Sequence, residues 1–345
     1  MSEHRGRHVL VFDDSGREEW NKRTEVNSLR MWNGTGQSAN MESGLKTAIC
    51  RGQNEETIKM TDKTEIQHWT MKIKPREKLW HIDFREIWRY RDLIMLFVKR
   101  NIVVQYKQTV LGPLWYLIQP ILTVIMNMVV FGNIAKMSTD GMPQALFYMA
   151  GNICWSYFSD CLNQSSNTFI ANQNMFGKVY FPRLVVPIAV VISNLLRFVI
   201  QAGLFAALYL YFFVNGAPIA PNCTILLTPL LVVMLAGLGL GFGILISSLT
   251  TKYRDFTVLF SFIVQLWMYA TPIVYPISMV EGEPLRTLIM ANPVTSIIEA
   301  FRYAALGQGY FSWLALGYSF LFMSVLLLFS VAIFNKVQRN FMDSV

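Results

Sequence analysis

The sequence predicts an all-α integral membrane protein with six transmembrane helices, and its composition and charge distribution carry this prediction. Of the 345 residues, 53% are hydrophobic and 15% are charged, and the mean hydropathy is +0.35. A water-soluble domain is less apolar and more highly charged. The charge is also uneven, because 20 of the 30 Lys and Arg residues precede Gly112. A polar N-terminal part is therefore followed by an apolar part that holds the spans.

The polar part divides into two regions. Residues 1–78 are polar and have little periodicity, which is typical of a disordered extension. They contain no apolar core of the length that a signal peptide requires, so we expect this extension in the cytoplasm. In residues 79–111, Ile87, Ile94 and Phe97 recur at helical spacing among basic residues, which predicts an amphipathic helix in the membrane interface. An ordinary cytosolic amphipathic helix would show the same pattern.

Residues 112–345 form the predicted membrane domain. It contains six runs of the length and apolarity that a membrane-spanning helix needs, too uniformly apolar for the strands of a barrel. The six runs are Gly112–Ile134, Ala145–Ala171, Leu184–Phe213, Thr224–Leu249, Phe256–Tyr275 and Trp313–Phe334. With the N-terminus inside, Lys136, Arg286 and Arg302 are the only loop cations outside, so both termini are predicted to be cytoplasmic.

The segment between the last two spans, Pro276 to Ser312, is too long for a simple connection. It contains Asn292-Pro293, a pair that is typical of a helix start because Asn caps the first turn and Pro suits its first position. The helix that follows is too short to cross a bilayer. We therefore predict re-entrant helices before the last span.

Several kinds of chemistry are missing from the sequence. There is no GxxxxGK[ST] loop, and the run Gly237–Gly243 lies inside an apolar span, where spaced glycines favour close helix packing over dinucleotide binding. All four His residues precede the first span, and the four Cys residues show no CxxC spacing. We expect no metal, no cofactor bound by this chain, no catalytic residues and no nucleic-acid partner.

Two ionisable residues lie near the middle of predicted spans, Asp160 in the second and Arg197 in the third. A lone charge in hydrocarbon is costly, so we predict that these two side chains pair. Such a pair would fix the register of two helices or take part in substrate passage.

Aromatic residues make up 14% of the chain and cluster in or near the spans. They suit an interfacial belt, or a channel in which flat rings contact sugar faces while Ser159, Asn163 and Gln265 supply polar partners. The candidate channel residues are Trp115, Tyr116, Tyr148, Trp155, Tyr157, Phe158, Trp267 and Tyr269.

Four sequence blocks resemble the membrane (permease) subunit of type 2 ABC transporters that export O-antigen, capsule or teichoic-acid polymers. The blocks are Tyr90-Arg91-Asp92-Leu93 with the following Leu111-Gly112-Pro113-Leu114-Trp115, then Lys252-Tyr253-Arg254-Asp255-Phe256, Thr271-Pro272-Ile273-Val274-Tyr275-Pro276, and Asn292-Pro293 with Phe301-Arg302. The resemblance covers about Ile82 to Phe341. The chain departs from the family in residues 1–59, and Met60 would be a natural start.

The resemblance implies a homodimer in the bacterial inner membrane that passes an undecaprenyl-linked glycan outward among the membrane lipids. A separate ABC ATPase subunit would use ATP, so this chain would be a permease and not an enzyme. An exporter of a small lipid or drug from the same superfamily is an alternative. A membrane-embedded glycosyl- or acyltransferase fits less well, because it needs a cluster of acids, His or Lys near one face.

The resemblance also implies roles for particular segments. The interface helix corresponds to Asp83–Val98, and the re-entrant helices to Leu285–Leu306, with an outer gate formed by Asn292, Pro293, Glu299 and Arg302. A short helix that docks on the ATPase corresponds to residues 172–183. Its coupling residues would be Asn174, Phe176, Lys178, Tyr180, Phe181 and Arg183. This segment could also be a simple amphipathic connector.

Overall fold

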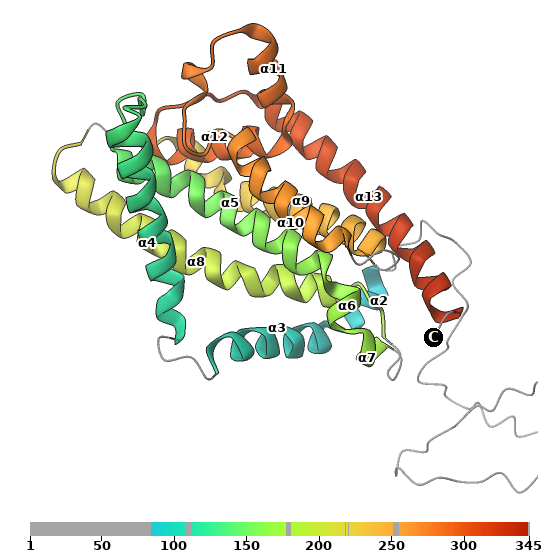
Figure 1. Ribbon diagram of the computed structural model, residues 1–345. Coiled ribbons are helices and arrows are strands. Elements are labelled where there is room, and N and C mark those ends of the chain that lie inside the picture. Colours follow the sequence, from blue (N-terminus) through green and yellow to red (C-terminus); the bar gives the residue numbers. More distant parts are fainter. Residues whose placement is uncertain are drawn as a thin grey trace, which may run out of the picture. The chain divides into compact units, whose positions relative to one another are not determined.

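A computed structural model describes residues 84–107, 112–176, 181–217, 219, 221–250 and 255–343. Every regular element in these ranges is a helix, which confirms the all-α prediction (Figure 1). The predicted disorder of residues 1–78 concerns a part of the chain outside the described residues.

The helices follow one another along the chain with short connections. In order they are α2 (Phe84–Arg89), α3 (Arg91–Tyr106), the 3-10 turn η2 (Gly112–Leu114), α4 (Trp115–Asn127) with its π-helical continuation η3 (Met128–Ile134), α5 (Gln144–Ser166), α6 (Thr168–Ala171), α7 (Gln173–Phe176), α8 (Val185–Val214), η4 (Cys223–Leu227), α9 (Thr228–Thr250), α10 (Phe256–Ala270), η5 (Ile277–Met279), α11 (Glu283–Ala291), α12 (Pro293–Leu306) and α13 (Trp313–Asp343).

Helix α5 is the centre of the described bundle. It packs against α4, α8, α9, α10 and α12, and 16 of its 23 residues are buried. Figure 1 shows α5 running alongside α8, with α4 crossing in front of them. The main core cluster therefore forms around α5, whose seven remaining residues are half-buried.

Four helical segments of the described chain are long and apolar enough to cross a bilayer. They are Trp115–Ile134, Val185–Val214, Cys223–Thr250 and Trp313–Val337. The other two predicted spans differ from the prediction. Helix α5 has 23 residues, which is long enough to cross, but it is not among the four segments that are apolar enough. Helix α10 has 15 residues and is ~22 Å long, whereas the hydrocarbon core of a bilayer is ~30 Å thick.

The fifth predicted span ends earlier than expected, at Ala270 instead of Tyr275. Pro272 causes this end, because a proline disfavours helical backbone at the residue before it. Thr271 accordingly has an extended conformation, with φ −105° and ψ 138°.

The predicted interface helix Asp83–Val98 is two helices in the structure, separated at Tyr90, and the second continues to Tyr106. Helix α3 packs against α8. Its Phe97 is buried, whereas Leu96 is 60% exposed. An exposed apolar side chain next to basic residues suits a helix at a membrane interface.

The segment before the last span contains two short helices, α11 and α12. The Asn292 side chain accepts a hydrogen bond from the backbone N–H of Val294 at 3.2 Å, so it caps α12. Helix α12 ends at Gly307, whose φ of 78° is left-handed. The short helix that the Asn-Pro pair predicts is therefore present.

Glycines of α9 allow two neighbouring helices to approach closely. A Cβ on Gly239 or Gly243 would lie 2.7 Å from Cys161 Cβ or 2.5 Å from Ser165 Cβ, both in α5. A Cβ on Gly237 would meet Met323 of α13 at 2.5 Å. The glycine run packs helices on both sides of α9, as small residues do in membranes.

Gly243→Ala should destabilise the protein by ~1–3 kcal/mol, because the new methyl group also meets the Leu162 carbonyl at 3.0 Å and forces α5 and α9 apart. The measurement is the melting temperature of the purified protein in detergent. Gly203→Ala is the control, since nothing lies within 4 Å of its Cβ, and it should leave the melting temperature unchanged or raise it slightly. Equal melting temperatures for the two variants would contradict this packing.

Candidate functional site

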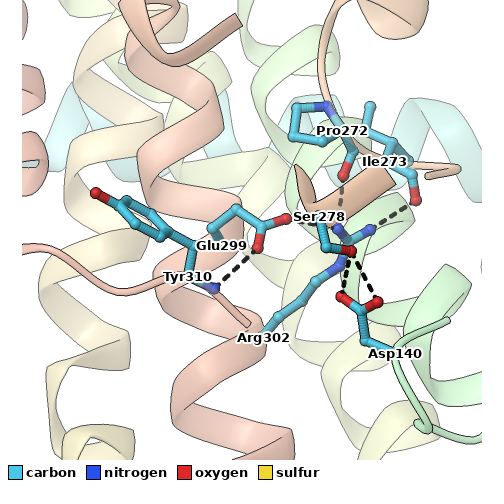
Figure 2. Close-up of polar contacts among 7 residues, drawn as sticks. All are labelled: Asp140, Pro272, Ile273, Ser278, Glu299, Arg302 and Tyr310. Carbon is cyan, nitrogen blue, oxygen red and sulfur yellow. Dashed lines mark hydrogen bonds and ion pairs between the residues drawn. The ribbon is translucent and has the colours of Figure 1, made fainter. Parts of the chain in front are cut away.

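A buried ion pair joins α12 to the irregular segment that follows α10 (Figure 2). Arg302 Nη1 donates to Glu299 Oε1 at 2.9 Å and to the Pro272 carbonyl at 2.6 Å. Nη2 donates to the Ile273 carbonyl at 2.6 Å. The side chain of Arg302 is fully buried. One guanidinium thus satisfies two carbonyls that have left the regular helix.

Helix α5 completes the surroundings of Arg302. The guanidinium carbon lies 3.9 Å from the centroid of the Phe147 ring, a cation–π contact. A Cβ on Gly151 would lie 2.6 Å from Arg302 Nη2, so glycine is needed for this approach. Figure 2 also shows Tyr310, whose backbone N–H points at the second oxygen of Glu299.

The other two predicted gate residues lie at the start of the same helix. Asn292 donates from Nδ2 to Thr271 Oγ1 at 2.9 Å, and the Pro293 carbonyl accepts from Ser319 Oγ of α13 at 2.9 Å. The structure thus places the four predicted gate residues on one helix, tied to the end of α10 and to the last span. Nearby, Ser278 donates to the carboxylate of Asp140 at 2.8 Å (Figure 2).

A second ion pair lies between α5 and α8. Arg197 Nη1 donates to Asp160 Oδ2 at 2.6 Å, and Nη2 donates to Gln119 Oε1 of α4 at 2.9 Å. The side chains of Arg197 and Asp160 are 18% and 24% exposed. The structure places the two predicted partners together and adds Gln119 as a partner of Arg197, a contact that was not predicted. Its signal would have been a polar amide inside an apolar span.

The predicted channel aromatics do not share one surface. Tyr148, Trp155, Tyr157 and Phe158 are buried within the chain itself. Trp155 and Phe158 pack on the ring of Trp267, with centroids 6.3 and 5.4 Å apart. The prediction that these rings face a channel is wrong for the four buried residues, because burial in the α5 core removes more apolar surface from water.

The remaining predicted channel aromatics lie at or near the surface. Trp115 is 49% exposed and Tyr269 is 56% exposed. Tyr116 and Trp267 are partly buried, and the Tyr116 ring lies 5.3 Å below the guanidinium of Arg197. The positions of these four side chains are compatible with an interfacial belt and with a channel wall.

Three predicted coupling residues face the interior of the chain. Phe176, Phe181 and Arg183 are between 4% and 6% exposed. The rings of Phe176 and Phe181 are 5.7 Å apart, and the Arg183 guanidinium lies 5.3 Å from the Phe176 ring. Burial lowers the pKa of Arg183 from its ordinary value.

The prediction that Phe176 and Phe181 present their rings to a partner is therefore wrong. Their cluster also includes Phe97 of α3, Phe169 of α6 and Phe334 of α13, and it joins these elements to the start of α8. The Asn174 side chain, Lys178 and Tyr180 lie outside the described residues. Within the described part of the chain, no group of three or more His, Cys, Asp or Glu could hold a metal ion.

Comparison with known proteins assigns the family. Residues 92–306 match the model of the family described as ABC-2 type transporter, a membrane domain. The chain belongs to the ABC-2 type transporter family. It is a multi-pass membrane protein of the permease type, as the resemblance implied.

Relatives of this ABC-2 protein are named for the export or transport of polysaccharides. The chain is 27% identical to an O-antigen export system permease protein RfbA of Myxococcus xanthus, over 63% of this chain and 82% of the relative. It is 28% identical to an RfbA of Klebsiella pneumoniae, over 73% of this chain and 94% of the relative. The polysialic acid transport protein KpsM of Escherichia coli is 24% identical, over 71% and 93%.

Arg302→Met should destabilise the protein by ~3–5 kcal/mol, because it leaves Glu299 buried without its counter-charge. Melting of the purified protein in detergent measures the loss. Arg286→Met is the control, since Arg286 is exposed and lies 5.8 Å from the Tyr310 ring, and its loss should cost less than ~1 kcal/mol. Similar melting for both variants would show that the buried cation is not a structural clamp.

Asp160→Arg and Arg197→Asp should each lower the stability of the protein by ~1–3 kcal/mol, because each places two like charges between α5 and α8. The exchange of both charges should restore much of the loss, since Gln119 can donate as well as accept. Expression level and melting of the two single variants and the double variant test this. A double variant no better than the single variants would contradict a pairing role.

Proposed function

We propose that this chain is the transmembrane subunit of an ATP-driven exporter that moves lipid-linked polysaccharide outward across the bacterial inner membrane. The observation that carries the proposal is the agreement among relatives: the chain aligns with 82% to 94% of the length of proteins named for O-antigen export or polysialic acid transport. The polymer would be of the O-antigen, capsule or teichoic-acid type, linked to undecaprenyl. A small lipid or a drug is the alternative cargo.

The working unit in this proposal contains two copies of the chain and two copies of an ABC ATPase subunit that binds and hydrolyses ATP. Helix α10 supports the dimer, because its 15 residues are too few to cross a bilayer alone and it exposes Phe262 and Leu266, both more than half exposed. A second copy would cover this face.

The proposed topology has six spans, cytoplasmic termini and α11–α12 re-entering from the outer side. The distribution of Lys and Arg supports the orientation, because 20 of the 30 precede the first span. Arg302 supports the re-entrant arrangement, since it satisfies backbone carbonyls that lipid could not.

The segment from α7 to the start of α8 would transmit the motion of the ATPase. Its contact residues would be Asn174, Lys178 and Tyr180, while the buried Phe176 and Phe181 tie the segment to the bundle. Phe169 of the adjoining α6 stacks on Phe334 of α13, with ring centroids 4.7 Å apart. A push on this segment would therefore reach the start of α8 and the last span together.

The test is deletion of the gene, followed by complementation with the tagged chain. Deletion should abolish the surface polysaccharide. The complementing chain should restore it and should co-purify with the ABC ATPase subunit. Normal surface polysaccharide in the deletion strain would contradict the proposed cargo.

Two variants distinguish a loss of coupling to the ATPase from a loss of folding: Tyr180→Glu and Phe176→Glu. Tyr180→Glu should leave expression and melting unchanged while export falls, because a coupling contact is lost. Phe176→Glu should lower the amount of folded protein, because it buries a carboxylate in an aromatic cluster. Normal export by the Tyr180→Glu variant would refute the coupling role of this residue.

A further inference from the structure

One face of α5 is polar in the C-terminal half of the helix. Between Ser156 and Ser166, the residues that are not buried are Ser156, Ser159, Asp160, Asn163 and Gln164. Their spacing of i, i+3, i+4, i+7 and i+8 places all five on one side of the helix. We call these five residues the α5 polar face.

The outer surfaces of the neighbouring spans are different. Helix α8 exposes Leu196 and Val199, and α13 exposes Leu321 and Val325. Such side chains suit lipid, whereas a row of amides, hydroxyls and a carboxylate does not. The polar face contributes, with Asn152 and the other polar residues of the helix, to the absence of α5 from the four described segments that are apolar enough to cross a bilayer. It must therefore face water or another polar surface.

The α5 polar face has hydrogen-bonding capacity left over. Gln164 accepts from Asn194 at 3.3 Å through Oε1, which leaves its NH₂ group for another partner. The side-chain amide of Asn163 has no hydrogen-bond partner among the described residues. Asp160 uses Oδ2 for Arg197, which also balances its charge. The face thus offers donors and acceptors without a net charge.

We propose that the α5 polar face is a binding surface for the hydroxyl groups of the exported polysaccharide as the polymer passes through the membrane. A sugar hydroxyl both donates and accepts, as do the amides of Asn163 and Gln164. Because these amides are neutral and half-buried, their bonds can exchange from one sugar to the next without holding it. This inference rests on the proposed function, and it identifies residues that would line the path of the exported polysaccharide.

Accessibility to a water-soluble thiol reagent is the first test, made in inside-out membrane vesicles with the full chain and its ATPase, because the proposed topology places the C-terminal half of α5 toward the cytoplasm. Cys50 and Cys223 are changed to Ser, while Cys154 and Cys161 stay because both are buried. Asn163→Cys should then react with a membrane-impermeant maleimide. Leu195→Cys on α8 is the control, because Leu195 is exposed at a span position that we expect to face lipid and lies next to Asn194, which bonds Gln164 at the same depth, so it should not react.

Export is the second test, with a matched pair of variants. Ser159 and Ser324 are both half-buried, and each donates to a carbonyl of its own helix, at 3.2 and 2.9 Å. Ser159→Leu and Asn163→Leu should lower the rate of polysaccharide export by about tenfold, the effect expected from one lost hydrogen-bond partner. Ser324→Leu should export normally. Protein level and co-purified ATPase should be unchanged in all three.

The outcomes separate this inference from the proposed function. A wild-type chain that fails to restore surface polysaccharide to the deletion strain would overturn the proposed function. If the wild type restores it, normal export by both Ser159→Leu and Asn163→Leu would overturn the α5 polar face alone. An unreactive Asn163→Cys would also overturn it, because water would then not reach the face.

Discussion

The arrangement of the described bundle depends on how Arg302 satisfies backbone that is not helical. After Pro272 ends α10, the carbonyls of Pro272 and Ile273 have no helical N–H to bond, and an unsatisfied carbonyl is costly inside a membrane protein. Arg302 donates to both at 2.6 Å and balances its charge with Glu299. A single side chain therefore allows the chain to leave α10, turn and begin the short helices α11 and α12.

This solution also fixes the packing around α5. The guanidinium lies against Phe147 and requires a glycine at position 151, so α12 packs tightly against the first half of α5. Gly239 and Gly243 of α9 close another side of the same helix. Because two sides of α5 are packed this tightly, the polar side chains of its second half have a fixed direction. The direction of the α5 polar face is thus a consequence of how its other sides are packed.

The sequence was informative where one physical rule dominates. Hydrophobic runs predicted the helices, Asn292-Pro293 predicted a helix start, and the cost of an isolated charge predicted that Asp160 and Arg197 would meet. It was misleading for aromatic residues, because a ring suits a core, an interface and a channel wall equally well. Trp155 and Phe176 are both buried, and only tertiary packing decides this. The clamp by Arg302 could not be predicted, since its acceptors are backbone carbonyls about 30 residues earlier and carry no side-chain signal.

The burial of the aromatic residues changes how the proposed pathway would work. If Tyr148, Trp155 and Tyr157 lined it, sugars would bind by stacking, and each ring would hold a sugar face strongly enough to slow its departure. Amides and hydroxyls exchange hydrogen bonds with water and sugar at little net cost. A path lined by them lets a long polymer advance without a deep energy minimum at any residue. The pairing of Asp160 with Arg197 contributes to this, because an unpaired charge at the same place would bind ions or charged sugars and hold them.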